Sequence, residues 1–251
     1  MGTGCFVTGT DTGVGKTLIA CALLRAFAAR GRRVVGMKPV AAGATGAEDG
    51  WRNEDVAALA EASNVQAARE WINPYLLAAP VAPHLAAAAE GVAIDFGRIE
   101  RSLAQLRAVA DIVVVEGVGG FRVPLNDRED SADLAARLVL PVVLVVGMRL
   151  GCLNHALLTA EAIGARGLRL AGWVANRIEP GMARAAENVA ALCERLSAPL
   201  IGDVPFMREP RATEAASALE VGRLLEHLEL PPDGERSGAH RRRTSPRRSS
   251  G

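Results

Sequence analysis

The chain has 251 residues, 49% of them hydrophobic and 23% charged, which is enough to bury one substantial core. Its net charge of +1 is unevenly spread, because residues 236–251 hold six Arg and no acidic group, leaving 23 basic and 28 acidic groups in residues 1–235. A mildly acidic domain gives no reason to expect nucleic-acid binding.

Neither a signal peptide nor a membrane span is predicted, because the amino-terminal residues lack a basic region and the longest apolar run covers about half a bilayer. Four scattered cysteines without a CxxC pair indicate reduced, mostly buried thiols. We therefore expect a cytoplasmic protein. Residues 1–230 are predicted to form a single domain. Residues 231–251, basic and nearly free of apolar side chains, are predicted to be a disordered tail.

Along the chain, short β-branched runs alternate with stretches rich in Ala and Leu. Strands are predicted at 5–8, 33–38, 111–117, 142–147, 170–176 and 200–205. Helices are predicted at 16–29, 53–61, 96–110, 131–138, 153–165, 182–196 and near 215–227. Most of the strands are apolar throughout, which is typical of a parallel sheet covered on both faces. The order predicts an α/β fold, a doubly wound and mainly parallel sheet flanked by helices, similar to P-loop NTPases.

Polar residues follow several of these strands. In a doubly wound sheet, ligands bind outside the carboxyl ends of the strands. We therefore expect the residues after the strands to meet at one edge; they are Thr8–Thr17, Lys38, Glu116–Gly117, Asn176–Arg177 and Asp203–Phe206.

The stretch "GTDTGVGKT", residues 9–17, joins the first predicted strand to the first predicted helix. Glycines and a helix N-terminus can direct backbone N–H groups at phosphate oxygens. Lys16 would reach the terminal phosphates and the Thr17 hydroxyl would bind Mg²⁺. Gly9 and Gly15 are separated by one residue more than in the usual pattern, so an ordinary glycine-rich turn is the alternative. The intact Gly-Lys-Thr in this context favours nucleotide binding.

Asp11 argues against one class of P-loop protein. In partition and division-site ATPases the loop resembles KGGxGKT, and its first Lys supports hydrolysis across a dimer. Asp11 occupies that place, and a carboxylate cannot neutralise a transferred phosphate. The basic tail is the only feature that supports such a switch ATPase, which stays open as an alternative.

Lys16 and Lys38 are the only two lysines in the chain, against 27 arginines. Lys38 ends a predicted buried strand and should face the ligand, where an ammonium fits better than a guanidinium fork; an exposed surface lysine is the alternative. Glu116 ends another apolar strand, at the Walker-B-like position. Asp55 opens a predicted helix, so helix capping is an alternative for it. Thr17, Asp55 and Glu116 would together suit Mg²⁺.

Longer stretches then match one family. They run in order over about residues 4–207: "FVTGTDTGVGKT" (6–17), "GMKPVAAG" (36–43), "RNEDVAAL" (52–59), "NPYLLAAPVAPHLAA" (73–87), "VVVEGVGGFRVPL" (113–125), "LPVVLVVGMRLGCLNHALLT" (140–159), "LAGWVANRI" (170–178) and "GDVPF" (202–206). In these stretches the chain resembles the dethiobiotin synthetases of the biotin pathway. The longer phosphate loop is that family's own form.

The resemblance implies a homodimeric ligase that uses ATP and Mg²⁺, with the active site near the dimer interface. Its substrates would be 7,8-diaminopelargonate and CO₂ or bicarbonate. One substrate amine becomes a carbamate, the γ-phosphate activates it, and the second amine closes the ureido ring to give dethiobiotin, ADP and phosphate. The substrate amines are the nucleophiles, so the protein positions them and neutralises charge.

The resemblance also assigns roles to residues. Lys16 and Lys38 would be catalytic, and Thr17, Asp55 and Glu116 would hold the metal. The implied nucleotide-binding residues are Gly13, Val14, Gly15, Lys16, Thr17, Leu18, Asp55, Glu116, Gly117, Val118, Gly119, Asn176, Arg177, Pro205, Phe206 and Met207. The implied substrate-binding residues are Thr12, Lys38, Ala42, Gly119, Cys152, Leu153 and Asn154, the last three acting through amides that bind the substrate carboxylate of the partner subunit.

Two positions depart from the family pattern. Family members often carry Ser at the place of Ala42, and some carry Glu at the place of Gly13. Each change removes one possible contact to substrate or nucleotide. A cobyrinic acid synthase-like amide ligase is the enzyme alternative. It would need a glutamine amidotransferase domain, for which we expect no room in this chain.

Overall fold

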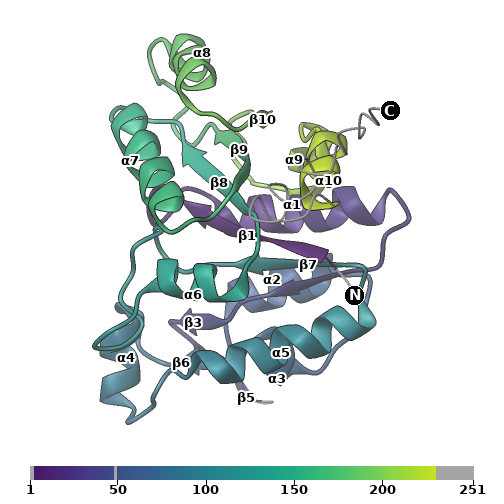
Figure 1. Cartoon of the computed structure of the whole chain (residues 1–251), viewed down its shortest axis with the longest axis vertical. Helices are drawn as coiled ribbons and strands as arrows, with labels where there is room; N and C mark the ends of the chain where they lie inside the picture. The colour runs from purple at the N-terminus through teal and green to yellow at the C-terminus, as the bar shows by residue number, and fades with distance from the viewer. Residues whose placement is uncertain (1–2, 48–49, 230–251) are drawn as a thin grey trace, which may run out of the picture.

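The computed structural model describes residues 3–47 and 50–229 (Figure 1). The predicted tail at 231–251 lies outside the described residues. The central sheet has six strands, all paired in parallel, in the order β10-β9-β8-β1-β7-β2. These strands are β1 (Thr3–Gly9), β2 (Val34–Met37), β7 (Ile112–Glu116), β8 (Val142–Gly147), β9 (Leu170–Asn176) and β10 (Leu200–Val204). All six strands predicted from the sequence are confirmed, and so is the doubly wound fold.

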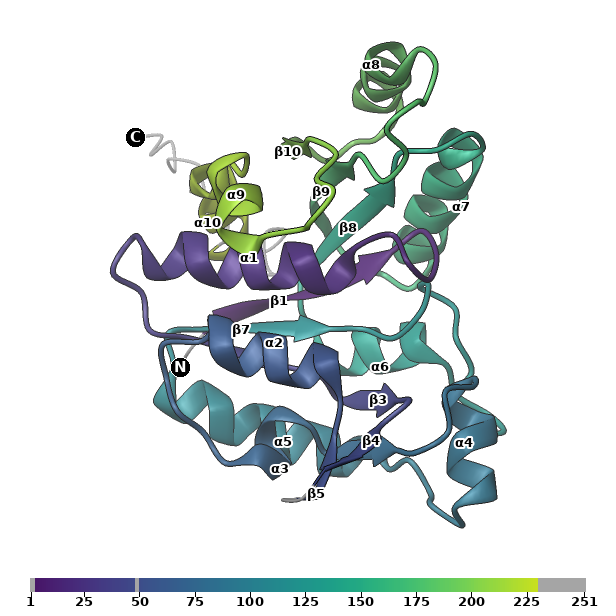
Figure 2. The same ribbon diagram turned by 180° about the vertical axis from the view of Figure 1, so that it is seen from behind.

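Helices cover both faces of this sheet. Figure 1 looks onto the face with α5 (Phe96–Val109), α6 (Ser131–Leu138) and α7 (Cys152–Ala165), with α8 (Ala185–Arg195) beyond α7. Figure 2 looks onto the opposite face, where α1 (Lys16–Ala28) lies beside α2 (Glu54–Ala62), α9 (Ala212–Ser217) and α10 (Val221–Glu229). Two layers of helices explain why the strands are apolar on both sides.

Alternate side chains of the central strands enter different cores. Phe6, Val113 and Val115 pack with α5 and α6, whereas Val7 and Val114 pack with α1 and α2. Because side chains alternate along a strand, an apolar run buries residues in both layers. The result is a rigid centre whose strand ends hold the polar residues in place.

Several short elements were not predicted. They are β3 (Val40–Ala42), β4 (Thr45–Ala47), β5 (Gly50–Arg52), β6 (Tyr75–Leu77), α3 (Arg69–Ile72) and α4 (Pro83–Ala89). β3 pairs in parallel with β6, and β4 pairs antiparallel with β5. Five of these segments have three or four residues and α4 has seven, too few for a periodic pattern that distinguishes them from loops.

Two predicted helices differ from the structure. The one predicted at 182–196 begins only at Ala185, because Arg184 adopts a left-handed conformation with φ of 57°. The one predicted near 215–227 is two helices, α9 and α10. The chain between them pairs with β10, where the N–H of Glu220 donates to the carbonyl of Ile201 over 2.8 Å and Leu219 bridges Gly202.

The described cysteines are free thiols, as predicted. Cys5, Cys21 and Cys152 are buried and Cys193 is exposed. Burial raises the pKa of Cys5 and of Cys21 to about 12, so these two thiols stay protonated and unreactive. No helix within residues 3–47 and 50–229 is long and apolar enough to cross a membrane.

Candidate active site

The phosphate loop follows β1 and ends where α1 begins. Gly15 caps α1 with φ of 90°, and a Cβ atom there would lie 2.2 Å from Nδ2 of Asn176. That nitrogen donates to the carbonyl of Val14 over 2.8 Å. Glycine is therefore required at position 15 for two reasons, backbone conformation and space. Asn176, predicted to bind nucleotide, also fastens the loop to the end of β9.

Lys16 is held inside this loop. Its side chain is buried, and Nζ donates to the backbone carbonyl of Asp11 over 3.0 Å. Burial, and after it the positive charge of Lys38, lower the pKa of Lys16 to about 8. Near neutral pH the ammonium is therefore poised close to its titration range, and an arriving phosphate would favour the charged form.

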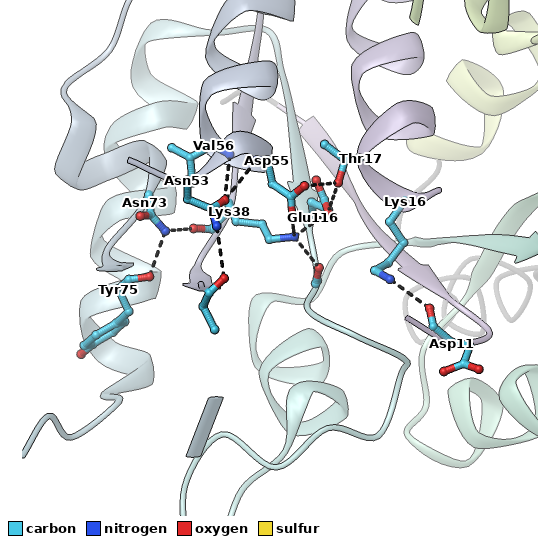
Figure 3. Close-up of polar contacts among 12 residues, drawn as sticks. Asp11, Lys16, Thr17, Lys38, Asn53, Asp55, Val56, Asn73, Tyr75 and Glu116 are labelled. Atoms are coloured by element: carbon cyan, nitrogen blue, oxygen red, sulfur yellow. Dashed lines mark hydrogen bonds and ion pairs between the residues drawn. The ribbon is translucent and has the colours of Figure 1, made fainter. Parts of the chain in front are cut away.

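Lys38 lies at the centre of a polar cluster at the strand ends. Its Nζ atom lies 2.5 Å from Oε1 of Glu116 and 3.0 Å from Oδ2 of Asp55, and donates to the carbonyl of Gly117 over 3.3 Å. Figure 3 shows Lys38 pointing toward Asp55 and Glu116, whereas Lys16 points toward Asp11. Lys38 is 3% exposed, so the surface-lysine alternative is wrong.

The charges in this cluster stabilise one another. Burial by itself would lower the pKa of Lys38, but Glu116 and Asp55 raise it above its ordinary value. Burial would raise the pKa of Asp55, but Lys38 and the Thr17 hydroxyl hold it below its ordinary value. The two carboxylates therefore favour the charged form of Lys38.

Three oxygen-bearing side chains meet beside Lys38. The Oγ1 atom of Thr17 lies 2.8 Å from Oδ1 of Asp55 and 2.9 Å from Oε1 of Glu116. The second carboxylate oxygen of Glu116 is buried and has no hydrogen-bond partner among the described residues. An unsatisfied buried carboxylate oxygen is a ready ligand for a hard cation, so the predicted metal set of Thr17, Asp55 and Glu116 fits Mg²⁺.

The capping alternative for Asp55 is resolved by its neighbour. Asn53 is the N-cap of α2, and its side chain accepts hydrogen bonds from the backbone N–H groups of Asp55 and Val56. Asp55 stands in the first turn, where a negative charge is favourable, and its carboxylate reaches Lys38 and Thr17. The helix start thus places Asp55 in the cluster.

A cavity of about 710 Å³ opens between the phosphate loop and this cluster. It contains the predicted residues Thr12, Gly13, Gly15, Lys16, Thr17, Lys38, Ala42, Asp55, Glu116, Val118 and Gly119. The sequence reasoning missed its other wall, formed by Pro80, Val81, Ala82, Pro83 and Val123. The signal for the first four was the stretch "APVAPH", in which one proline restricts the backbone before α4 and the second begins the helix.

A second cavity of about 260 Å³ lies on the other side of the phosphate loop. It is lined by the predicted residues Gly13, Gly15, Leu18, Asn176, Arg177, Pro205, Phe206 and Met207, and by Ile178 and Pro210, which were not predicted. Arg177 makes a two-pronged ion pair with Asp203, at 2.8 and 2.7 Å. The ion pair fixes the guanidinium in the lining of this mainly apolar cavity, which suits an aromatic base.

Comparison with known proteins decides the family. A model of the AAA domain matches residues 3–213. An ATP-dependent dethiobiotin synthetase of Aromatoleum aromaticum is 58% identical over 216 residues, covering 86% of this chain and 96% of the relative. One of Nitrosospira multiformis is 57% identical over 225 residues, covering 89% and 97%. The chain belongs to the dethiobiotin synthetase family. It is an ATP-dependent ligase with a role in biotin biosynthesis.

Solved structures share the fold of this synthetase-family chain at low identity. The septum site-determining protein MinD of Pyrococcus horikoshii, in complex with Mg-ADP, has a TM-score of 0.55 at 15% identity, covering 89% of each chain. MinD of Aquifex aeolicus has a TM-score of 0.56 at 18% identity, covering 91% of this chain and 99% of the other. These likenesses extend to the fold alone.

In this member of the dethiobiotin synthetase family, the start of α7 lies outside both cavities. The Cys152 side chain is buried in the core and its amide donates to the carbonyl of Arg149 over 3.0 Å, while Asn154 is exposed. The predicted contact of Cys152, Leu153 and Asn154 with substrate concerns a second subunit and stays a prediction. Val14 and Gly117 are buried and do not line the main cavity, so their predicted contacts with nucleotide stay a prediction.

Proposed function

We propose that this chain carboxylates 7,8-diaminopelargonate and closes the ureido ring, converting ATP, CO₂ and the diamine into dethiobiotin, ADP and phosphate. The observation that carries the proposal is the buried Lys38, anchored by Glu116 and Asp55 at the edge of a cavity that reaches the phosphate loop. A fixed cation between the phosphate and substrate spaces is what transfer of phosphate to a carbamate requires.

The two lysines would divide the charge neutralisation. Lys38 is already held by two carboxylates, so it would stabilise the carbamate and the transferred phosphate without moving. In the part of the chain that the structure describes, Lys16 is hydrogen-bonded to a neutral carbonyl only, so it can leave Asp11 and follow the β- and γ-phosphates. The substrate amines remain the nucleophiles, and the protein contributes position and charge.

The metal would bind at the oxygen cluster. Thr17, Asp55 and the unpartnered oxygen of Glu116 would hold Mg²⁺, which when bound would neutralise phosphate charge. Asp55 is 42% exposed and is free to shift, whereas Glu116 is buried and paired with Lys38.

The opposite wall would select the substrate. Pro80, Val81, Ala82 and Pro83 present apolar surface across the cavity from Lys38, and Val123 adds to it. An aliphatic chain would be favoured there, and water would be excluded from the reacting atoms. We further propose that the chain works as a cytoplasmic homodimer, in which the amides at Leu153 and Asn154 bind the substrate carboxylate of the partner at a helix N-terminus.

A direct assay tests the proposal. The protein is mixed with ATP, Mg²⁺, labelled bicarbonate and 7,8-diaminopelargonate, and acid-stable label and ADP are measured. We expect both to appear only when the diamine is present. ADP formation independent of the diamine, with no fixed label, would refute the ligase reaction and favour a switch ATPase.

A further inference from the structure

A groove of about 640 Å³ lies between α5 and α6, away from the site described above. Helices in a parallel α/β sheet run opposite to the strands, so the last turns of α5 and α6 lie at the edge opposite the phosphate loop. Figure 1 shows both helices on one face of the sheet. The groove is lined by Leu103, Ala104, Ala108, Leu138 and Val139, together with Glu100, Arg107 and Arg137.

Arg107 stands out among the lining residues. Within residues 3–47 and 50–229 it makes no hydrogen bond or ion pair, and its Nε atom is buried without an acceptor. Arg137 pairs with Glu100 over 3.0 Å, so the groove carries one uncompensated positive charge. Burial lowers the pKa of Arg107. A buried guanidinium donor without a partner is unfavourable, and an anion in the groove would satisfy it.

Val139 is a second, independent irregularity. It follows the last residue of α6 in the left-handed region, with φ of 51°, where glycine is the usual residue and a β-branched residue is strained. Its side chain is nevertheless 65% exposed and lies on the groove wall. A glycine would relieve the strain, so the valine needs another reason, and apolar contact in the groove supplies one.

We propose that the α5–α6 groove binds a small monocarboxylate with an apolar chain, its carboxylate on Arg107 and its chain against Leu138 and Val139. A carboxylate matches the planar donor fork of Arg. The alanines and leucines exclude a strongly hydrated chain, and the volume is that of small-molecule sites. The site goes beyond the proposed reaction and does not depend on it.

Octanoate is the probe. It is titrated by calorimetry into the protein with excess ADP and Mg²⁺, so that Lys16 of the phosphate loop is occupied. We expect one saturable site per chain, and little binding of hexanol or octylammonium. Arg107→Gln should weaken octanoate binding about tenfold, because one charge-assisted pair is lost. Arg101→Gln, on the exposed side of the same helix, is the matched control and should bind normally.

Val139→Gly tests whether the strained valine contributes to binding in the groove. It should leave the melting temperature equal or higher, because the strain is relieved, while weakening octanoate binding several-fold. Saturable binding that is unchanged by Arg107→Gln and Val139→Gly would overturn the proposal, and so would no saturable binding at millimolar octanoate. A groove covered by a second copy of the chain would also overturn it, and would appear as dimers that dissociate in Arg107→Glu.

The source of the carboxylate can be found in the same experiment. Dethiobiotin, the product proposed above, is itself a monocarboxylate with an apolar chain. Competition between dethiobiotin and octanoate that is lost in Arg107→Gln would support a product site. Octanoate binding without such competition would support a carboxylate from another source.

Discussion

The carboxylate of Asp11 accepts a hydrogen bond from Nη2 of Arg149 over 2.5 Å, which joins the phosphate loop after β1 to the loop after β8. The same carboxylate accepts from the N–H of Thr12 over 2.7 Å, and the carbonyl of Asp11 holds Lys16. The hydrogen bond from Thr12, with Arg149, holds the pKa of Asp11 below its ordinary value. Asp11 thus organises the loop in which switch ATPases carry a lysine.

Asp11→Asn should weaken nucleotide binding more than folding. The ion pair is roughly half exposed, so its loss should change the free energy of unfolding by no more than about 1 kcal/mol. The phosphate loop, however, loses its side-chain link to the loop after β8, and we expect KM for ATP to rise about tenfold. Steady-state kinetics and urea unfolding measure the two effects. Arg149→Gln should behave alike, and the double variant should be no worse than either. Additive losses would contradict a shared role.

Lys38→Arg should lose most activity although the charge is kept. The ammonium fits among three oxygens at 2.5, 3.0 and 3.3 Å, and a guanidinium fork would need more room in a site that is 3% exposed. We expect kcat to fall about a hundredfold, the scale of losing one positioned donor. Arg101→Lys, at an exposed position, is the control for the general effect of exchanging lysine and arginine. A variant near the parent rate would show that Lys38 has no such role.

Nucleotide binding near pH 8 should take up a proton. The pKa of Lys16 is about 8 in the folded chain, so roughly half of the ammonium groups are neutral there, and bound phosphates should restore the charge. Calorimetry of ADP binding in buffers of different ionisation enthalpy measures the uptake. It should shrink toward pH 6.5, and it should be absent in Lys16→Arg, whose side chain is always charged.

The same pKa has a consequence for stability. It lies below the ordinary value of 10.5, so between about pH 8 and pH 10.5 the unfolded chain binds more protons at Lys16 than the folded chain. Lys16 should therefore add stability as pH rises through this window, and the burial penalty of its ammonium should be present in full below pH 8. A comparison of the parent with Lys16→Gln by urea unfolding at pH 7.5 and pH 9.5 isolates this contribution.

Gly15→Ala and Gly13→Ala form a matched pair. Both residues have positive φ, at 90° and 74°, but a Cβ atom meets Asn176 at position 15 and open space at position 13. Gly13→Ala should cost about 1 kcal/mol from backbone strain alone. Gly15→Ala should cost more and should also displace Asn176 from Val14. Equal free energies of unfolding in the two variants would contradict the steric role of Asn176.

The long elements and the strand ends could be predicted from the sequence. An apolar run such as Val142–Gly147 is stable as a strand that is buried on both faces of the sheet. Parallel strands then bring their carboxyl ends to the same edge of the sheet. The amino-acid pattern alone was therefore enough to place Lys38 and Glu116 at the same edge of the sheet. The wall at Pro80–Pro83 could not be placed in this way, because nothing local in an Ala- and Pro-rich loop tells which cavity it faces.

The partner of Asp11 also escaped prediction. Asp11 and Arg149 are 138 residues apart, and the chain has 27 arginines. No local sequence pattern marks one of them as the partner of Asp11. The break at Ala218–Glu220 was missed for a similar reason. Helix propensity favours an unbroken helix there, and only contact with β10 makes the alternative stable.

That contact with β10 has a wider consequence. β10 is a terminal strand of the sheet, and an unpaired terminal strand offers its N–H and C=O groups to any other chain. Leu219 and Glu220 occupy part of that border, and α9 and α10 also pack on α1, the helix that carries Lys16 and Thr17. The segment after Met207 thus covers part of the border of the terminal strand and packs against the helix that carries Lys16 and Thr17.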